Sequence, residues 1–282
     1  GVAGVAWATL IAQGMCAVAS LLVMFRRMKR LPCEPGREGE KIPLFHLLAV
    51  KRIAQIGLPS MLQQSLVSLS MMMMQGLVNS FGKVLVAGYT AATKIDNIAI
   101  LPMLNVGNAL SAFTAQNMGA GKVDRARKTM FAAMGFAFLM SAAVFALVNL
   151  FPDGIVQVFL GSSETEDMSA EVLGHCVTYG AEYLRMISYD YLLTSVLFCI
   201  TGLAMGVGQT LFSMCNGILS SLLLRIPAAY LFGKALGWGL AGVGLAAPCA
   251  SAGGLLVGVV YLLTGAWKKG RLVQPAPKPM TD

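Results

Sequence analysis

Long apolar stretches that are almost free of charged side chains dominate this chain and determine its fold class. Only 12% of the residues are charged, against about a quarter in a soluble domain. A helix needs about 20 apolar residues to cross the roughly 30 Å of hydrocarbon in a bilayer. The sequence therefore predicts an all-α, polytopic membrane helix bundle that lies in the lipid bilayer. We expect seven transmembrane helices, at residues 3–25, 53–79, 85–116, 130–151, 174–205, 211–235 and 240–266.

Charges in the connections predict the orientation of the chain. The connection 26–41 carries six basic residues against three acidic, and both 122–128 and the tail 268–282 are also basic. Residues 152–173, on the opposite side, carry acidic residues and no Lys or Arg. Because Lys and Arg favour cytoplasmic connections, we expect an outside N-terminus, a cytoplasmic C-terminus and a cell inner (plasma) membrane. The net charge of +8 is then mainly a topology signal, and nucleic acid is not an expected partner.

The start of the chain differs from a secretory signal peptide. Gly1 already lies in an apolar stretch, and the basic residues Arg26, Arg27 and Lys29 follow that stretch. A signal peptide has its basic region before its apolar core. We therefore expect that the chain is truncated at its N-terminus.

Charged residues inside the predicted spans are the leading functional candidates, because a charge in hydrocarbon is costly. Asp190 lies well inside the stretch 174–205, and Thr194 follows one turn later on the same helix face. A carboxylate placed there can bind and release a proton, or it can ligate Na⁺ together with hydroxyl and carbonyl oxygens. We interpret Asp190 and Thr194 as cation-coupling residues. The alternative is a structural ion pair between Asp190 and a basic residue of a neighbouring helix.

A polar patch in the stretch 85–116 contains Lys94, Asp96 and Asn97. Lys94 and Asp96 are two residues apart, so they point to different faces of their helix. We expect Asp96 to take part in cation coupling, and Lys94 and Asn97 to line a substrate cavity. The alternative for Lys94 is an ion pair with Asp96 or Asp190.

Two neutral side chains complete the predicted substrate cavity. Gln64 follows Pro59 in the second predicted span, and Tyr191 is next to Asp190. Amides and hydroxyls can coordinate a cation or hydrogen-bond a drug-like molecule, although they can equally bond a neighbouring helix. Arg225 lies within the stretch 211–235, and its expected role is a pair with an acidic residue.

Residue patterns typical of enzymes and metal sites are missing from the sequence. No nucleophile–base arrangement and no pair of catalytic carboxylates stand out. The two histidines, His46 and His175, lie near the ends of apolar stretches, and the six cysteines show no C-x-x-C spacing. We therefore expect neither catalysis, nor a cofactor, nor a metal site, and H⁺ or Na⁺ enters only as a coupling ion.

One junction between two apolar stretches resembles a known transporter family. Within residues 111–128, an apolar helix ends in Gln116-Asn117, turns through Gly119 and Gly121, and leads into a basic helix start. This junction resembles that of the multidrug and toxic compound extrusion (MATE) family, in which Gln-Asn-x-Gly-Ala-Gly precedes Asp-Arg-Ala-Arg. Further stretches are similar to the family in the same order, at residues 1–13, 56–64, 88–96 and 202–210.

The resemblance implies a domain organisation. MATE transporters have twelve spans in two six-helix lobes, so this chain resembles the sixth span followed by the C-terminal lobe. Residues 1–25 would be the last helix of a truncated N-terminal lobe, and 26–52 the cytoplasmic connection between lobes. Residues 53–267 would form the C-terminal six-helix lobe, and 268–282 a cytoplasmic tail. The missing N-terminal lobe is then an expected partner, because alternating access needs two opposing walls.

The resemblance also implies a function. The family exports cationic or amphipathic drugs using a Na⁺ or H⁺ gradient, so we expect a bacterial, cation-coupled multidrug antiporter. Some sodium-coupled members carry an acid two turns before the Gly-x-x-x-Gly of the tenth span, where this sequence has Thr194, with Asp190 one turn earlier. Coupling is expected from Asp190 or from an acid in the missing lobe. The alternatives are a flippase of a lipid-linked carbohydrate precursor, which the basic residues Lys94, Arg185 and Arg225 would suit, and a seven-helix receptor or sensor.

Overall fold

The computed structural model describes residues 2–28, 47–161 and 170–269. Within these residues every regular element is a helix, which confirms the expected all-α class. The chain divides into two compact units, Gly1–Leu47 and Leu48–Asp282. In the first unit the structure describes the helix α1 (Val2–Met28), which has Arg26 and Arg27 in its last turn. Basic side chains there interact favourably with the carbonyl end of the helix.

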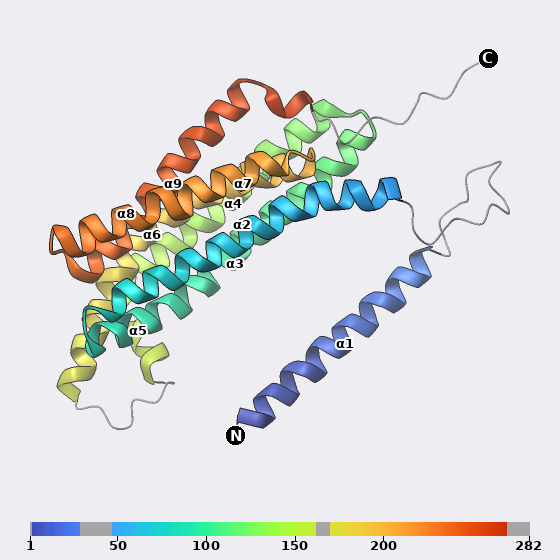
Figure 1. Ribbon diagram of the computed structural model, residues 1–282. Coiled ribbons are helices and arrows are strands. Elements are labelled where there is room, and N and C mark those ends of the chain that lie inside the picture. Colours follow the sequence, from blue (N-terminus) through green and yellow to red (C-terminus); the bar gives the residue numbers. More distant parts are fainter. Residues whose placement is uncertain (1, 29–46, 162–169, 270–282) are drawn as a thin grey trace, which may run out of the picture. The chain divides into compact units, whose positions relative to one another are not determined.

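The elements of the second unit in chain order are α2 (Leu47–Asn79), α3 (Lys83–Gly119), α4 (Val123–Leu150), α5 (Pro152–Gly161), α6 (Ala170–Gly206), α7 (Thr210–Ile218), η1 (Leu219–Leu224), α8 (Arg225–Ala229), η2 (Tyr230–Ala235), α9 (Gly239–Leu263) and η3 (Ala266–Lys269). In this unit, short turns join α2 to α3, α3 to α4, and α6 to α7 (Figure 1). The axes of its longest helices are roughly aligned. Because a turn reverses the chain, two long helices joined by a turn run in opposite directions.

Among the described residues, six helices are long and apolar enough to cross a membrane by length and composition. They match six of the seven predicted spans, and they are Ala6–Met28, Lys83–Gly119, Val123–Leu150, Glu171–Gly206, Thr210–Ala235 and Gly239–Leu263. The stretch predicted at 53–79 is indeed helical, as part of α2. Its Gln and Ser side chains, which include Gln63 and Gln64, make α2 less apolar than the six. The count of seven spans therefore stays a prediction.

The helix α6 is the centre of the second unit and packs against α3, α4, α5, α7 and α9. Its contact with α3 depends on glycines of both helices. A Cβ atom on Gly88 would lie 2.7 Å from the carbonyl oxygen of Cys176, and one on Gly202 would collide with the carbonyl oxygen of Gly107. Small residues allow two membrane helices to approach this closely. The α3–α6 pair is thus held backbone to backbone at both ends of the contact.

The junction between α3 and α4 is a helix cap that requires glycine. Gly121 has a φ of 71°, which L side chains rarely adopt. The N–H of Lys122 donates to the carbonyl oxygen of Asn117 at 2.8 Å, and the N–H of Gly121 donates to that of Met118 at 3.0 Å. This is the Schellman arrangement, which satisfies carbonyls at the end of a helix. Gly208, with a φ of 85°, forms the same cap after α6.

The span Thr210–Ala235 is a continuous but irregular helix. Two π-helical segments, η1 and η2, lie on either side of the short helix α8, which contains Pro227. Proline has no N–H and its ring clashes with the preceding turn, so the regular bonding pattern cannot continue through it. The N–H of Arg225 instead donates to the carbonyl oxygen of Ser220, five residues earlier. Single π turns of this kind often occur at functional sites.

We expect Gly202→Ala to destabilise the second unit, because the added methyl group would collide with the Gly107 carbonyl. Overpacking of a tight contact costs about 1–3 kcal/mol. Thermal unfolding of the purified protein in detergent should therefore show a lower midpoint. Gly135→Ala in α4 is the matched control, since nothing lies within 4 Å of its Cβ position. Equal midpoints for the two variants would contradict the glycine-mediated contact.

Candidate functional site

Two carboxylates from different helices lie together in the interior of the second unit. Asp96 belongs to α3 and Asp190 to α6, and their side chains are only 8% and 6% exposed. The two helices that carry them pack closely against each other. Two buried acids without a compensating charge would be strongly unfavourable in a membrane.

A basic residue in the electrostatic range of both acids is Arg225, the first residue of α8. Within the described part of the chain, no ion pair or hydrogen bond joins its guanidinium to Asp96 or Asp190. The side chain is partly buried, and its backbone lies at the boundary between the π-helical segment η1 and α8. The expected pairing of Arg225 with an acid therefore stays a prediction. We refer to Asp96, Asp190 and Arg225 as the charged cluster.

Hydroxyl groups complete the surroundings of the charged cluster. The hydroxyl-bearing residues Ser251 of α9 and Thr194 of α6 lie close to Asp190. Their own hydroxyl oxygens lie 3.1 Å apart. Thr194 occupies the Asp190 face of α6, as predicted, and the hydroxyl of Tyr191 interacts with Asp96. Helices α3, α6, α8 and α9 thus all contribute to this polar interior.

Several polar atoms of the charged cluster and of the neighbouring Tyr191 are buried and lack a hydrogen bond within the described part of the chain. They are Oδ1 of Asp96, Oδ1 of Asp190, the hydroxyl of Tyr191 and Nε of Arg225. Leaving a buried polar group unpaired costs about 1–3 kcal/mol. These atoms include both donors and acceptors, so the arrangement can take up a proton, a water molecule or a small ion. The described ranges contain no group of three or more His, Cys, Asp or Glu side chains suited to hold a metal ion.

The remaining predicted cavity residues lie on exposed positions of the second unit. Gln64 of α2 is exposed, as are Lys94 and Asn97 of α3. Lys94 and Asp96 point to different faces of α3, as predicted, because one is exposed and the other buried. Tyr191, which was also expected to line the cavity, is fully buried beside Asp96. The structure therefore brings together Asp96, Asp190, Thr194 and Tyr191, and separates them from the three exposed residues.

A second polar group, which the sequence does not single out, lies between α7, η1 and α9. Oδ1 of Asn216 and Oγ of Ser220 are buried without a hydrogen bond to any described residue. Both atoms lie against Gly254 of α9. A Cβ atom added to Gly254 would collide with Oγ of Ser220 and would lie 3.5 Å from Oδ1 of Asn216. Ser251 lies one turn before Gly254 on α9. A lone serine in an apolar span gives no sequence signal, because most such residues simply bond their own helix.

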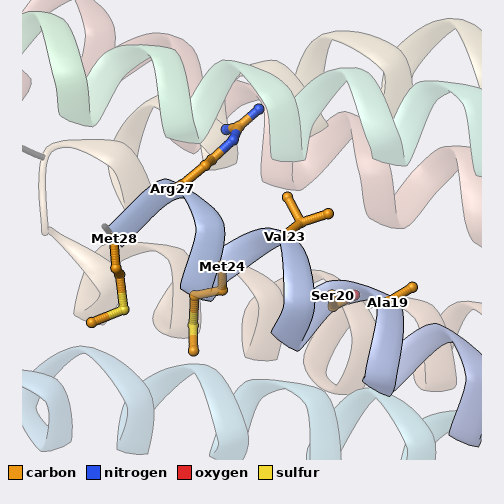
Figure 2. Close-up of a pocket in the computed structure, with 6 residues that line it drawn as sticks. All are labelled: Ala19, Ser20, Val23, Met24, Arg27 and Met28. Carbon is orange, nitrogen blue, oxygen red and sulfur yellow. The ribbon is translucent and has the colours of Figure 1, made fainter. Parts of the chain in front are cut away.

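A hollow along α1 is unlike the charged cluster (Figure 2). Figure 2 shows that the side chains of this hollow come from a single helix, and they are Ala19, Ser20, Val23, Met24, Arg27 and Met28. Arg27 points away from Met24 and Met28. A binding site usually has several polar groups that converge on a ligand. The α1 hollow offers one charged group on an otherwise mostly apolar face, so it is not a candidate site.

Known proteins similar to this chain are transporters of one family. The MatE family model matches residues 59–231. A probable multidrug resistance protein of Bacillus subtilis, YpnP, is 27% identical over 272 residues, which cover 96% of this chain and 57% of the relative. The probable multidrug resistance protein NorM of Thermotoga maritima is 20% identical over 95% of this chain and 54% of its own length. The chain thus spans a little over half the length of these relatives.

Solved structures agree with the helical arrangement. An outward-facing multidrug resistance MATE family transporter of the MOP superfamily superposes with a TM-score of 0.70 at 25% identity, over 79% of this chain and 48% of that protein. An inward-facing transporter of the same description has a TM-score of 0.64 at 22% identity, over 80% of this chain and 50% of that protein. Since the family model alone covers more than half of the 282 residues, the chain belongs to the MatE family.

Proposed function

We propose that this chain forms one lobe, with one preceding helix, of a cation-coupled exporter of cationic or amphipathic drugs. The family consists of transporters and not of enzymes, and relatives such as YpnP are named as probable multidrug resistance proteins. Residues 1–25 would belong to the other lobe, 26–52 would connect the lobes, 53–267 would form the C-terminal lobe, and 268–282 its tail. Support comes from the matched length, which is about half that of the relatives.

The charged cluster is the observation that carries this proposal. Asp190 is the principal coupling residue, because it is buried well inside an apolar span and has the hydroxyls of Thr194 and Ser251 close by. Thr194 places its hydroxyl close to Asp190, and Asp96 is the second acid. Ionisable groups inside a span commonly mark ion pathways. Uptake or release of one H⁺ or Na⁺ here changes the net charge shared by α3, α6, α8 and α9.

The exposed residues of α2 and α3 are assigned to the substrate cavity. Gln64, Lys94 and Asn97 are polar, and Lys94 and Asn97 lie inside an apolar span. Polar side chains inside a span normally face the bundle interior or a water-filled cavity and not lipid. We therefore assign the face that carries these residues to a substrate cavity closed by the other lobe. The buried Tyr191 lies beside Asp96 and would line the inner end of this cavity.

The two alternative functions receive less support. A flippase of a lipid-linked carbohydrate precursor would use basic residues to hold phosphate groups. The negative charges of Asp96 and Asp190 near Arg225 would disfavour a phosphate group at that residue. Membership of a transporter family favours transport over a seven-helix receptor or sensor.

We further propose an inner-membrane protein with a cytoplasmic C-terminus. In a cysteine-free background, Lys83→Cys would then place a thiol outside the cell, and Asp124→Cys would place one inside. Both positions are exposed at helix starts. A membrane-impermeant maleimide should label Lys83→Cys in intact cells and Asp124→Cys only after permeabilisation. Labelling in the reverse order would overturn the proposed orientation.

We expect Asp190→Asn to abolish gradient-driven export, because the amide can neither take up a proton nor hold a cation. The measurement is efflux of a fluorescent cationic dye from vesicles containing the full-length parent protein, under an imposed H⁺ or Na⁺ gradient. Glu182→Gln is the matched control, since this acid lies on the same helix but is exposed. It should transport like the wild type.

Two results of the efflux experiment would count against the proposal. Efflux that survives in Asp190→Asn would move coupling to the other lobe and leave Asp190 with a structural role. Dye that stays in place under either gradient would favour the flippase.

This chain reconstituted alone should be inactive, because alternating access needs both lobes.

A further inference from the structure

We propose that a row of polar side chains on α7 and η1 binds water and lets it enter the interior of the second unit. This polar seam consists of Thr210, Ser213, Asn216 and Ser220. Because a water molecule both donates and accepts hydrogen bonds, water in the seam can pass on a proton. The inference rests on the proposed function only in giving a coupling H⁺ this route, since hydration of the seam can be measured by itself.

The first support is that the seam is polar, buried and regularly spaced within the apolar span Thr210–Ala235. Its members follow one another at intervals of three, three and four residues, which places them on one face of a helix. Thr210, Ser213 and Asn216 are only 2%, 1% and 3% exposed. Polar side chains inside a span normally face the interior of the bundle or a water-filled cavity. The seam therefore faces the protein and not lipid.

The second support is that the seam lies between two neighbouring helices. The hydroxyl of Ser213 donates to Oε1 of Gln63 on α2 at 3.3 Å. Gln63 is half-buried, so this side of the seam borders the surface of the second unit. Asn216 and Ser220 instead lie against Gly254 of α9, in the interior. The seam thus leads from α2 towards α9.

The third support is a pair of buried oxygens at the inner end of the seam. Oδ1 of Asn216 and Oγ of Ser220 lack a hydrogen bond to any described residue. Gly254 has no side chain, and both oxygens lie within 4 Å of the position that its Cβ atom would occupy. Buried waters typically bond polar groups that would otherwise be unpaired. A water molecule suits these two neutral groups, because it can donate to both of them.

The fourth support is that further hydroxyl groups continue from the inner end of the seam. Ser251 precedes Gly254 by one turn of α9, so the two residues share a helix face. The hydroxyl oxygen of Ser251 lies 3.1 Å from that of Thr194 on α6. Thr194 in turn follows Asp190 by one turn. The polar groups therefore extend from the start of α7 to the face of α6 that carries Asp190.

Reaction of engineered thiols with a water-soluble reagent tests this inference. Ser213→Cys, Asn216→Cys and Ser220→Cys are made singly in cysteine-free full-length protein, purified in detergent and treated with 2-aminoethyl methanethiosulfonate. Ser141→Cys is the matched control, since Ser141 is 0% exposed on α4 and its hydroxyl donates to the carbonyl oxygen of Phe138. A thiol reacts as its thiolate, which forms more readily in water than in apolar surroundings. Mass spectrometry of the intact protein should show that the three seam thiols react at least about tenfold faster than the control.

A methyl group at the inner end of the seam makes the test specific to the proposed water site. Gly254→Ala places a carbon atom in the space beside the two unpaired oxygens. Combined with Asn216→Cys, it should slow the modification towards the rate of the Ser141→Cys control. Gly135→Ala, which adds a methyl group with nothing within 4 Å, should leave the rate of Asn216→Cys unchanged.

Either of two outcomes would overturn the inference. One is a folded Asn216→Cys or Ser220→Cys variant that reacts as slowly as Ser141→Cys, which would show that the inner end of the seam is dry. The other is fast modification of Asn216→Cys that Gly254→Ala does not slow, which would show that the reagent arrives by another route. Should one of the two cysteine variants not fold, the other decides. Dye efflux is measured separately, so a failure of the export proposal is distinguishable from a dry seam.

Discussion

Charge compensation inside an apolar bundle is the constraint on which this structure depends. A membrane span offers no water to stabilise an ionised side chain, so Asp96 and Asp190 must either be protonated or have a positive charge beside them. Arg225 is the basic residue whose charge acts on both acids, and the mutually bonded hydroxyls of Thr194 and Ser251 lie close to Asp190. Removing one of these charges would leave the others buried without a counter-charge. The loss in stability would then exceed the stability that the intact group contributes.

The rest of the second unit holds these groups together. Glycines in α3 and α6 bring the two acids within reach, because a single Cβ atom at Gly202 would force the helices apart. The π-helical segments around Pro227 carry Arg225 out of the regular helical pattern. The glycine caps at Gly121 and Gly208 end α3 and α6 at defined residues and return the chain across the bundle. The glycine contacts, the π-helical segments and the glycine caps thus all help to position the side chains of the polar interior.

The sequence predicts the helices well and the cluster only in part. Apolar runs locate the spans because length and hydropathy dominate a helix in lipid, and only α2, with its Gln and Ser residues, departs from that pattern. Asp96, Asp190, Thr194 and Arg225 stand out because charge and hydroxyl are rare in such runs. Their convergence does not follow from the sequence, since it depends on the angle between α3 and α6. Ser251 and the two π-helical segments leave no local sequence pattern at all.

The central claim is that Asp190 and Arg225 act as one electrostatic unit, and a double-mutant cycle tests it most directly. Unfolding free energies of the full-length protein are measured for wild type, Asp190→Asn, Arg225→Gln and the double variant. Coupled charges predict that each single change is costly, and that the double change costs less than the sum by about 0.5–3 kcal/mol. Effects that simply add would show that the two residues do not interact, and would contradict the account.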